Sequence, residues 1–551
     1  MTPFETADRF VDELAELSPM ASTYLGIPGR DHLWDDLSPD GHAARADLGR
    51  RYRDAFAASL DHPDPVQRHA ARVMVDHLTL QLDAFEHGDH LDALRHLASP
   101  FGQVRGIFDV MARDDVAAWE AITRRLATID QPLAGYRATL EEGRRREKVA
   151  AVRQVRSVAH QARIAASDEG AFALLAADAE RRGFATAALA DAVAHARAAV
   201  ADFADYLEGE YLADAVETDG VGEERYLREA ERFLGMRLDP REAYDWGWEE
   251  IDRLLGELRR VAAEILPGAS VREVVELLET DPDRAASNPD EFVAFVERIE
   301  KQAVEDLAGV HFDVADEIRR VTVNLSPPGS PLGAHYLPPS EDFTRPGGVW
   351  YALADPHHIP LYQEVSTAYH EGFPGHHLQI GTVMVNRDRL SRAHRLLVWY
   401  SGYGEGWALY AERLMDELGY LREPEYRLGM LASHLFRAAR VVVDIGLHLG
   451  LRIPAGAPLF AGDRWDFDRA VRFMSEVGMQ SEAVADSEVK RYLGWPGQAI
   501  SYKLGEREIL RLREERAARE GSAFDLKAFH TSVLSWGEVR LDHLREIVSA
   551  A

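Results

Sequence analysis

The spacing of apolar positions predicts helices over the first part of the chain, to about residue 310. Apolar side chains recur there every three or four residues, in a background rich in Ala, Leu, Glu and Arg. Residues 191–207 and 243–265 are clear examples. Proline and glycine cluster at 18–29, at 62–65 and around Pro267, where they mark turns. The pattern therefore predicts an array of helices joined by turns.

The pattern changes at about residue 321. Residues 321–325 (VTVNL) alternate and are rich in branched side chains, which is typical of a strand, and a loop rich in Pro and Gly follows through Pro339. A turn then opens into a second short strand at 348–353, and helical spacing returns after Pro360. We therefore expect a mainly α fold with a small β element.

The composition is that of a globular protein that contains more than one folding unit. Hydrophobic residues make up 46% and charged residues 28% of the 551 residues. A chain of this length exceeds what one hydrophobic core supports, so we expect sub-domains around a shared cleft. The change of pattern divides the chain into a helical N-terminal region at 1–320 and a second region at 321–551, which holds the β element and the C-terminal helices.

Composition and charge also exclude several classes of function. No stretch approaches the roughly 20 apolar residues of a bilayer-spanning helix, and the acidic N-terminus does not resemble a signal peptide, so we expect a cytoplasmic protein without a membrane partner. A formal net charge of -30 argues against a nucleic-acid partner. With no cysteine in the chain, any metal must be bound by His, Asp or Glu.

Candidate chemistry lies at 368–380, which reads AYHEGFPGHHLQI. A His followed directly by Glu on a helix is half of a zinc-protease signature, in which the His binds metal and the Glu activates water. The second His normally follows the first by four residues, but Pro374 occupies that position. Two residues look inserted, so that His376 becomes the second ligand if a kink or π-type bulge at 373–375 turns it back toward His370. His377 is the rival ligand.

A third ligand is expected from a later helix, because catalytic zinc keeps three protein ligands and one open position. Residues 404–412 (GEGWALYAE) resemble the segment that supplies the glutamate ligand in gluzincin aminopeptidases, which makes Glu405 the candidate. Glu412 lies two turns later on the same helix face and is expected to support a ligand or to form a salt bridge. Single histidines are usually core or surface residues. The combination of His370, Glu371, His376 and Glu405 predicts a Zn²⁺ site.

The same hypothesis assigns the remaining steps of a hydrolysis. Glu371 takes a proton from water and passes it to the leaving amine, while zinc polarises the scissile carbonyl. Tyr492 and Tyr502 bracket a turn and are candidate donors to the oxyanion, although packing roles explain them equally well. Arg491 is a candidate for binding a substrate carboxylate, with a structural ion pair as the alternative.

Two further segments are candidates for contact with substrate. The strand at 348–353 closely precedes the metal helix, where an edge strand can pair with an extended peptide. Gly348 and Trp350 are then substrate-binding residues, and an ordinary half-buried strand is the alternative. Asp444 lies in an apolar stretch and must be paired if it is buried, so it is a candidate for orienting a ligand histidine or binding a substrate amine.

The sequence resembles the bacterial family called domain of unknown function 885, whose hallmark is the His-Glu-Gly-x-Pro-Gly-His-His stretch at 370–377. The resemblance covers most of the chain. It implies a helical zincin of the neurolysin-like kind, in which 321–551 is the catalytic region and a deep cleft binds short peptides. Further matching stretches are LGIPG at 25–29, LSPDG at 37–41, RPGGVWY at 345–351, EGWALYAE at 405–412, RVVVDIGLH at 440–448 and RYLGWPGQAISYKLG at 491–505.

Three functions are compatible with these residues. The first is a zinc peptidase that acts on short peptides. The second keeps the metal site but hydrolyses a non-peptide amide or an ester, because zinc-activated water attacks either carbonyl. The third is a non-enzymatic helical binding protein whose interrupted motif no longer binds catalytic zinc. The presence of Glu371 favours the two hydrolases, since a structural metal site has no need of a base.

Overall fold

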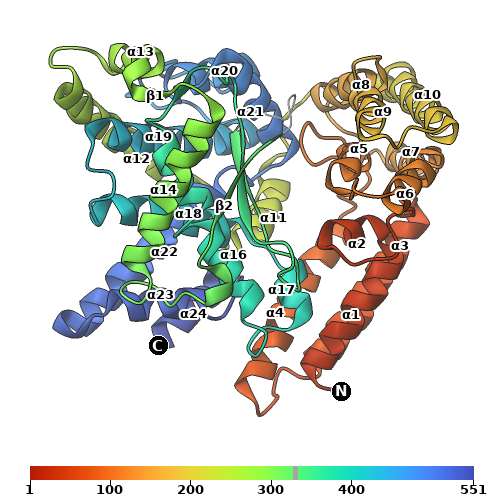
Figure 1. Cartoon of the computed structure of the whole chain (residues 1–551), viewed down its shortest axis with the longest axis horizontal. Helices are drawn as coiled ribbons and strands as arrows, with labels where there is room; N and C mark the ends of the chain where they lie inside the picture. Colours follow the sequence, from red (N-terminus) through yellow and green to blue (C-terminus); the bar gives the residue numbers. More distant parts are fainter. Residues whose placement is uncertain (327–332, 551) are drawn as a thin grey trace. The chain divides into compact units, whose positions relative to one another are not determined.

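Helices make up most of residues 1–326 and 333–550, which are the residues that this computed structural model describes (Figure 1). The mainly α fold expected from the sequence is confirmed. The chain forms two compact units. Unit 1 comprises Met1–Val221 with the short segments Ser391–Leu396 and Lys490–Trp495, and unit 2 comprises Gly222–Leu390, Leu397–Val489 and Pro496–Ala551.

Unit 1 is built from helices, several of which begin at a clear N-terminal capping signal in the sequence. Helices α1 to α5 each begin on a proline that follows Ser, Thr or Asp, since proline lacks the N–H that a first turn leaves unpaired. The helices are α1 (Pro3–Leu17), α2 (Pro19–Leu25), α3 (Pro39–Ala57), α4 (Pro65–Glu86), α5 (Pro100–Val110), α6 (Val116–Leu126), α7 (Asp130–Arg145), α8 (Val152–Ala166), α9 (Ala171–Arg182) and α10 (Ala187–Gly209), with a 3-10 turn at Tyr211–Ala213.

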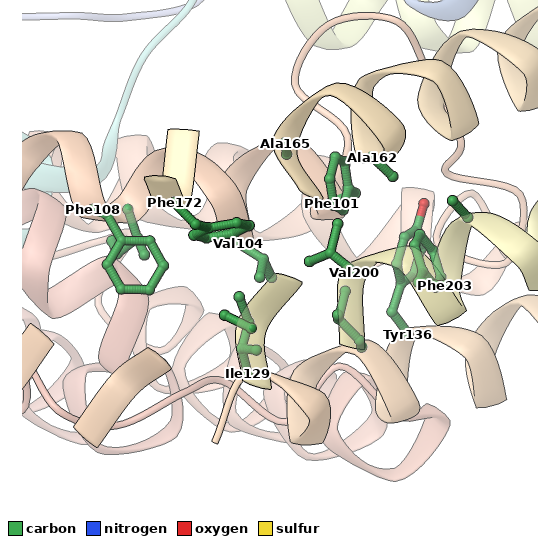
Figure 2. Packing of buried hydrophobic residues seen from close by; sticks show 14 of the residues in the cluster. Phe101, Val104, Phe108, Ile129, Tyr136, Ala162, Ala165, Phe172, Val200 and Phe203 are labelled. Atoms are coloured by element: carbon green, nitrogen blue, oxygen red, sulfur yellow. The ribbon is translucent and has the colours of Figure 1, made fainter. Parts of the chain in front are cut away.

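The core of unit 1 lies between α5 and the helices that follow it. Helix α10 turns one apolar face inward, and Val200 and Phe203 lie on it. Figure 2 shows these side chains with Phe101 of α5, whose ring stacks on that of Phe203 at a centroid distance of 5.9 Å. Burial of such side chains, at about 1.5–3 kcal/mol each, is what holds an array of helices together.

Unit 2 contains the remaining helices and the strands. Residues of α17 and α21 also supply the two short segments of unit 1. Short 3-10 turns lie at Pro282–Arg284, Asp316–Ile318 and Gly521–Ala523. The helices are α11 (Glu223–Leu234), α12 (Pro240–Ile265), α13 (Val271–Thr280), α14 (Pro289–Leu307), α15 (Glu364–Glu371), α16 (His376–Val385), α17 (Arg392–Leu397), α18 (Ser401–Glu417), α19 (Pro424–Leu449), α20 (Phe467–Glu476), α21 (Glu482–Gly494), α22 (Ser501–Glu520), α23 (Leu526–Leu534) and α24 (Leu541–Ala550).

The β element of unit 2 is a three-stranded sheet in the order β2-β4-β3. Strand β2 (Thr322–Leu325) runs parallel to β4 (Gly348–Ala352), and β3 (Gly333–Leu337) runs antiparallel to β4. Gly348 therefore pairs with a residue on each side, as does Trp350. The prediction that this strand is an edge that pairs with substrate through Gly348 and Trp350 is wrong, because both of its sides are already occupied.

The sequence predicted β2 and β4 but missed β3. The Pro- and Gly-rich loop expected after β2 falls partly on residues 327–332, which lie outside the described residues, and its later part forms β3. Two-residue strands β1 (Ala285–Ala286) and β5 (Ile359–Pro360) pair as a separate antiparallel ladder. These pairings join segments far apart in the chain, which local patterns do not report.

The boundary between the two compact units also differs from the boundary that the sequence pattern indicated at residue 321. The compact units separate at Val221, so the helices between residues 222 and 320 pack with the C-terminal part of the chain. The change at residue 321 marks only where the three-stranded sheet of unit 2 begins. Within the described residues, no helix is both long and apolar enough to span a bilayer.

Candidate metal centre

The helix that carries the His-Glu pair ends directly after it. Helix α15 stops at Glu371, and α16 starts at His376. Gly372–Gly375 form a turn in which the N–H of His377 reaches back five residues to the carbonyl of Gly372, at 3.1 Å, and the Phe373–Pro374 peptide is cis. The sequence predicted a kink or bulge at this place, and the structure has a complete interruption.

Distant residues hold this turn in place. The N–H of Phe373 donates to Oε2 of Glu300 on α14 at 2.8 Å, and the indole N–H of Trp407 on α18 donates to the carbonyl of Pro374 at 2.9 Å. A Cβ at Gly372 would lie 1.7 Å from Oε1 of Glu300, and a Cβ at Gly375 would lie 1.9 Å from the carbonyl oxygen of His370. The two glycines of the motif are thus needed for close packing.

The interruption brings together the three predicted ligands. His370, His376 and Glu405 each offer one atom to a group whose members all lie within 4.8 Å of one another. Oε2 of Glu405 lies 3.5 Å from Nε2 of His370 and 3.4 Å from Nε2 of His376. Two donors of a tetrahedral zinc shell, with bonds of about 2.0–2.2 Å, lie roughly 3.3–3.6 Å apart. The donor set and these separations fit zinc.

Glu412 fixes the orientation of the first histidine. Its Oε1 lies 2.8 Å from Nδ1 of His370, and its Oε2 accepts a hydrogen bond from the hydroxyl of Ser366. With Nδ1 engaged, the Nε2 atom of His370 is turned toward Glu405. A carboxylate that bonds the outer nitrogen of a ligand histidine is the usual support of a zinc site. Glu412 is therefore where the sequence predicted a supporting residue.

The charges of the cluster are those of two carboxylates that lie against imidazoles. Burial lowers the pKa of His370, but hydrogen bonds to Glu405 and Glu412 outweigh it and raise that pKa to about 9. Burial also raises the carboxylate pKa of Glu405, yet its contacts with His370 and His376 hold it well below its ordinary value. Contacts with His370 and His434 likewise hold the carboxylate pKa of Glu412 well below its ordinary value, although burial raises it. The pocket thus stabilises positive charge, which a divalent cation supplies.

A series of contacting polar side chains extends from Glu412 away from the cluster. Nε2 of His434 on α19 lies 3.5 Å from Glu412, and its Nδ1 lies 3.5 Å from Glu506 on α22. Lys503 then forms ion pairs with Glu506 and, at 2.9 Å, with Glu250 on α12. These last groups line a charged cavity of about 540 Å³. This series of polar groups was not predicted from the sequence, because its members share no local motif.

Helix α18, which carries Glu405, packs backbone to backbone against α22 (Figure 1). A Cβ at Gly406 would lie 2.5 Å from the carbonyl carbon of Gly505, and a Cβ at Gly505 would lie 2.0 Å from the carbonyl oxygen of Gly402. Such an approach is open only to glycine. It explains the glycines in the EGWALYAE and YKLG stretches, and it fixes the position of the third ligand.

His377, the rival ligand, points to a different neighbour. Its Nε2 lies 2.8 Å from the carbonyl of Ile318, and its ring meets the ring of Tyr336 edge-on at 5.5 Å. Burial lowers the pKa of His377 to about 4, so the imidazole is neutral and its Nε2–H donates a hydrogen bond to the carbonyl of Ile318. The structure thus brings His376 into the ligand cluster and assigns His377 to packing against the sheet.

The other predicted site residues are distributed over both units. Tyr492 and Arg491 belong to unit 1, where Tyr492 is fully buried and the guanidinium of Arg491 lies 6.0 Å from the centre of its ring. Tyr502 belongs to unit 2, as the metal cluster does. Asp444 accepts hydrogen bonds from Tyr226 and from the N–H of Gly497, so it joins segments of unit 2.

Glu371, the predicted base, is half-buried beside the cluster. Within the residues that the structure describes, no hydrogen bond or ion pair engages its carboxylate. Trp399, which sequence reasoning missed, lies near His376 with ring centroids 6.0 Å apart and is 42% exposed. Its indole fills the space beside Gly404. A Cβ added at Gly404 would lie 2.4 Å from Cη2 of Trp399. An open carboxylate and an exposed aromatic wall therefore flank the cluster.

These observations define a class, namely a mainly helical protein in which two buried histidines and a half-buried glutamate form one cluster and a second glutamate directly follows the first histidine. The chain belongs to the bacterial protein family of unknown function DUF885, whose model matches residues 19–548. The family membership predicted from the sequence is thereby confirmed. No curated protein matches the chain significantly in sequence.

Two solved structures resemble this fold. A candidate lipoprotein from Colwellia psychrerythraea superimposes with a TM-score of 0.84 at 23% identity, over 99% of this chain and 98% of that chain. A candidate lipoprotein of unknown function from Shewanella oneidensis superimposes with a TM-score of 0.74 at 18% identity, over the full length of both chains. At such identities the likeness shows the fold alone.

Proposed function

We propose that this protein is a zinc-dependent hydrolase that cleaves short peptides, as a neurolysin-like gluzincin with its substrate in a cleft beside the cluster. One observation carries the proposal. The carboxylate of Glu405 lies from His370 and from His376 at the donor separations of a tetrahedral zinc shell, all three donor atoms lie within 4.8 Å of one another, and Glu371, with an open carboxylate, directly follows His370. A structural metal site has no use for that carboxylate.

The residues of the chain divide the work of hydrolysis. Zinc, when bound by the three ligands, supplies a Lewis acid that polarises a carbonyl and makes water more acidic. Glu371 accepts the proton of the attacking water at its carboxylate and then donates it to the leaving amine. Glu412 keeps His370 in the tautomer that presents Nε2. The role of Glu412 is supported by the contact of its Oε1 with Nδ1 of His370, and the role of Glu371 by its place directly after His370 in the sequence.

A donor is also needed for the negative charge that develops on the carbonyl oxygen. Of the two tyrosines predicted for this role, Tyr502 is the candidate, because it belongs to the same compact unit as the cluster. Its ring lies under the guanidinium groups of Arg440 and Arg437, at 4.8 and 5.7 Å from its centre. Tyr492 is fully buried in unit 1 and is better explained by packing.

The proposal is tested by metal content together with hydrolysis. Zinc per chain is measured by elemental analysis in wild type, in Glu371→Gln and in Glu417→Gln, and each protein is offered a mixed peptide library. Glu417 lies on α18 as Glu405 does, but it is exposed and pairs with Arg513, so it is the matched control. We expect one zinc in all three proteins and cleavage by wild type and Glu417→Gln only.

The other outcomes separate the competing functions. One zinc per chain without any peptide cleavage would direct the search to non-peptide amides and esters. A chain that takes up no zinc, even when zinc is added, would contradict both hydrolases. Cleavage by Glu371→Gln at the wild-type rate would show that the base is a different residue.

A further inference from the structure

Among the residues that the structure describes, Arg437 on α19 has no acidic partner within ion-pair distance. Its Nη1 reaches the hydroxyl of Ser433 and, at 3.3 Å, the carbonyl of Ser433. Its Nε is buried and makes no hydrogen bond, and no carboxylate of the described residues lies within ion-pair distance of its guanidinium. Two other arginines of the same helix differ. Arg440 pairs with Glu488 at 2.8 Å, and Arg427 lies 3.3 Å from Asp416.

The place of Arg437 on α19 brings it near the metal cluster. It follows His434 by three residues, and residues so spaced are neighbours on one face of a helix. His434 contacts Glu412, which in turn bonds the ligand His370. In agreement with this geometry, the positive charge of Arg437 acts to lower the pKa of both His370 and Glu412. The guanidinium therefore lies on the side of α19 that faces the cluster.

The guanidinium is also held in place. It lies over the ring of Tyr502, whose centre is 5.7 Å away, and the ring is shared with Arg440. Contact with an aromatic face stabilises a cation only modestly and does not neutralise its charge. Because no carboxylate of the described residues lies within ion-pair distance, this half-buried cation, held in one position, is available to bind an anion from outside the protein.

The chemistry of the site indicates which anion this is. A guanidinium offers two parallel N–H groups that match one carboxylate, and the hydroxyl of Ser433 contacts Nη1 of Arg437. A phosphate dianion has more oxygens and more charge than this set satisfies. Among the substrates of a peptide hydrolase, the carboxylate that every linear peptide carries is the one at its C-terminus.

We propose that Arg437 binds the C-terminal carboxylate of the substrate, so that this protein acts on the C-terminal part of short peptides with a free carboxyl end. The proposal rests on the peptidase function proposed above. It makes Arg437 a residue that determines specificity, and it assigns no role in proton transfer to it. Peptides with a blocked C-terminus are then poor substrates.

The test compares one tripeptide, alanyl-alanyl-phenylalanine, with its C-terminal amide. The proteins are wild type, Arg437→Gln and Arg427→Gln, the last being a matched change at a paired arginine of the same helix. We expect wild type to prefer the free acid by about 10- to 100-fold in kcat/KM, which is the range for a hydrogen bond to a charged group. In Arg437→Gln the kcat/KM for the free acid should fall while that for the amide stays unchanged, so the preference is lost. Arg427→Gln should keep the preference. A preference that survives in Arg437→Gln, or is absent from wild type, overturns the proposal.

A binding measurement separates this proposal from the peptidase function. Zinc-loaded Glu371→Gln, with and without Arg437→Gln, is titrated with both peptides by calorimetry. If wild type cleaves neither peptide, tighter binding of the free acid that depends on Arg437 supports the carboxylate site while the hydrolysis fails. Equal binding of acid and amide contradicts the carboxylate site whether or not the protein is a peptidase.

A folding control completes the design. Zinc content and the thermal unfolding midpoint of Arg437→Gln should equal those of wild type. If that variant does not fold, Arg437→Lys decides, because lysine keeps the charge but lacks the two parallel donors. A preference lowered severalfold in Arg437→Lys supports binding of the carboxylate by both donors, and an unchanged preference contradicts it.

Discussion

Nδ1 of His370 lies 2.8 Å from Oε1 of Glu412, so the carboxylate two turns after Glu405 on α18 orients a ligand on α15. One helix thus supplies both a proposed metal ligand, Glu405, and the residue that orients another proposed ligand, His370. The two glutamates are seven residues apart, which places them on the same face of α18. A substitution of Glu412 should therefore change the affinity of the protein for the metal.

Glu412→Gln should weaken zinc binding by about 10- to 100-fold, which is the usual effect of removing the partner of a ligand histidine. The neutral amide no longer holds a proton on Nδ1 as a carboxylate does. The dissociation constant is measured by competition with a chromophoric chelator, and Glu417→Gln serves as the control on the same helix. Zinc affinity equal to that of wild type would mean that Glu412 has only a packing role.

The two adjacent histidines should behave differently when they are removed. His376→Ala should lose stoichiometric zinc, because His376 lies 3.4 Å from the carboxylate of Glu405, whereas His377→Ala should keep it, because His377 is bonded to the carbonyl of Ile318. Elemental analysis of both variants after dialysis against zinc checks this. The reverse result would make His377 the ligand.

Gly406→Ala should destabilise unit 2, because the added Cβ meets the backbone of Gly505 at 2.5 Å. Overpacking of this kind costs about 1–3 kcal/mol. Gly256→Ala, inside α12, is the control, since a Cβ there meets nothing within 4 Å. That change should stabilise the helix by about 0.5–1 kcal/mol. Thermal unfolding midpoints that move in opposite directions would agree with the packing, and a tolerated Gly406→Ala would contradict it.

Burial raises the pKa of Glu538 to about 8, although its carboxylate accepts hydrogen bonds from the N–H of Tyr400 and from Gln379. Because the folded-state pKa lies above the unfolded one, the neutral form stabilises the fold below about pH 4.5, and this contribution is lost as the pH rises through about 8. In the metal-free protein, the unfolding free energy of wild type should therefore fall relative to that of Glu538→Gln, by up to about 1.4 kcal/mol per pH unit.

The measurement is urea unfolding of both metal-free proteins between pH 5 and pH 9. A constant offset between wild type and Glu538→Gln is expected from the different hydrogen bonding of an amide, and only the slope of the difference tests the titration. A difference that does not change with pH would mean that Glu538 ionises in the folded protein as it does in the unfolded one.

The sequence was sufficient for features that depend on near neighbours in the chain. Helices α10 and α12 contain the predicted segments 191–207 and 243–265, because the apolar period of a long amphipathic helix outweighs local exceptions. The predicted ligands also came from local patterns, the His-Glu pair and a glutamate followed by glycine and an aromatic residue. Their assembly into one group needed only that a break at Pro374 shorten the path between His370 and His376.

Features set by distant partners were not accessible in this way. The turn between α15 and α16 is fixed by Glu300, 73 residues before Phe373, and no local signal links the two. Strand β4 was taken for an edge because the pairing of β3 depends on a segment that reads as a loop. Tyr492 and Tyr502 stand ten residues apart, yet packing assigns them to different units.

The four residues between α15 and α16 also affect how such centres are recognised. Since the second histidine follows the first by six residues instead of four, a text search for the short zinc-protease pattern passes over this chain. The separations between Nε2 and Oε2 atoms are nevertheless ordinary for the metal. A search that compares donor-atom distances in place of letter spacing would retrieve this chain together with proteins whose ligand helix is unbroken.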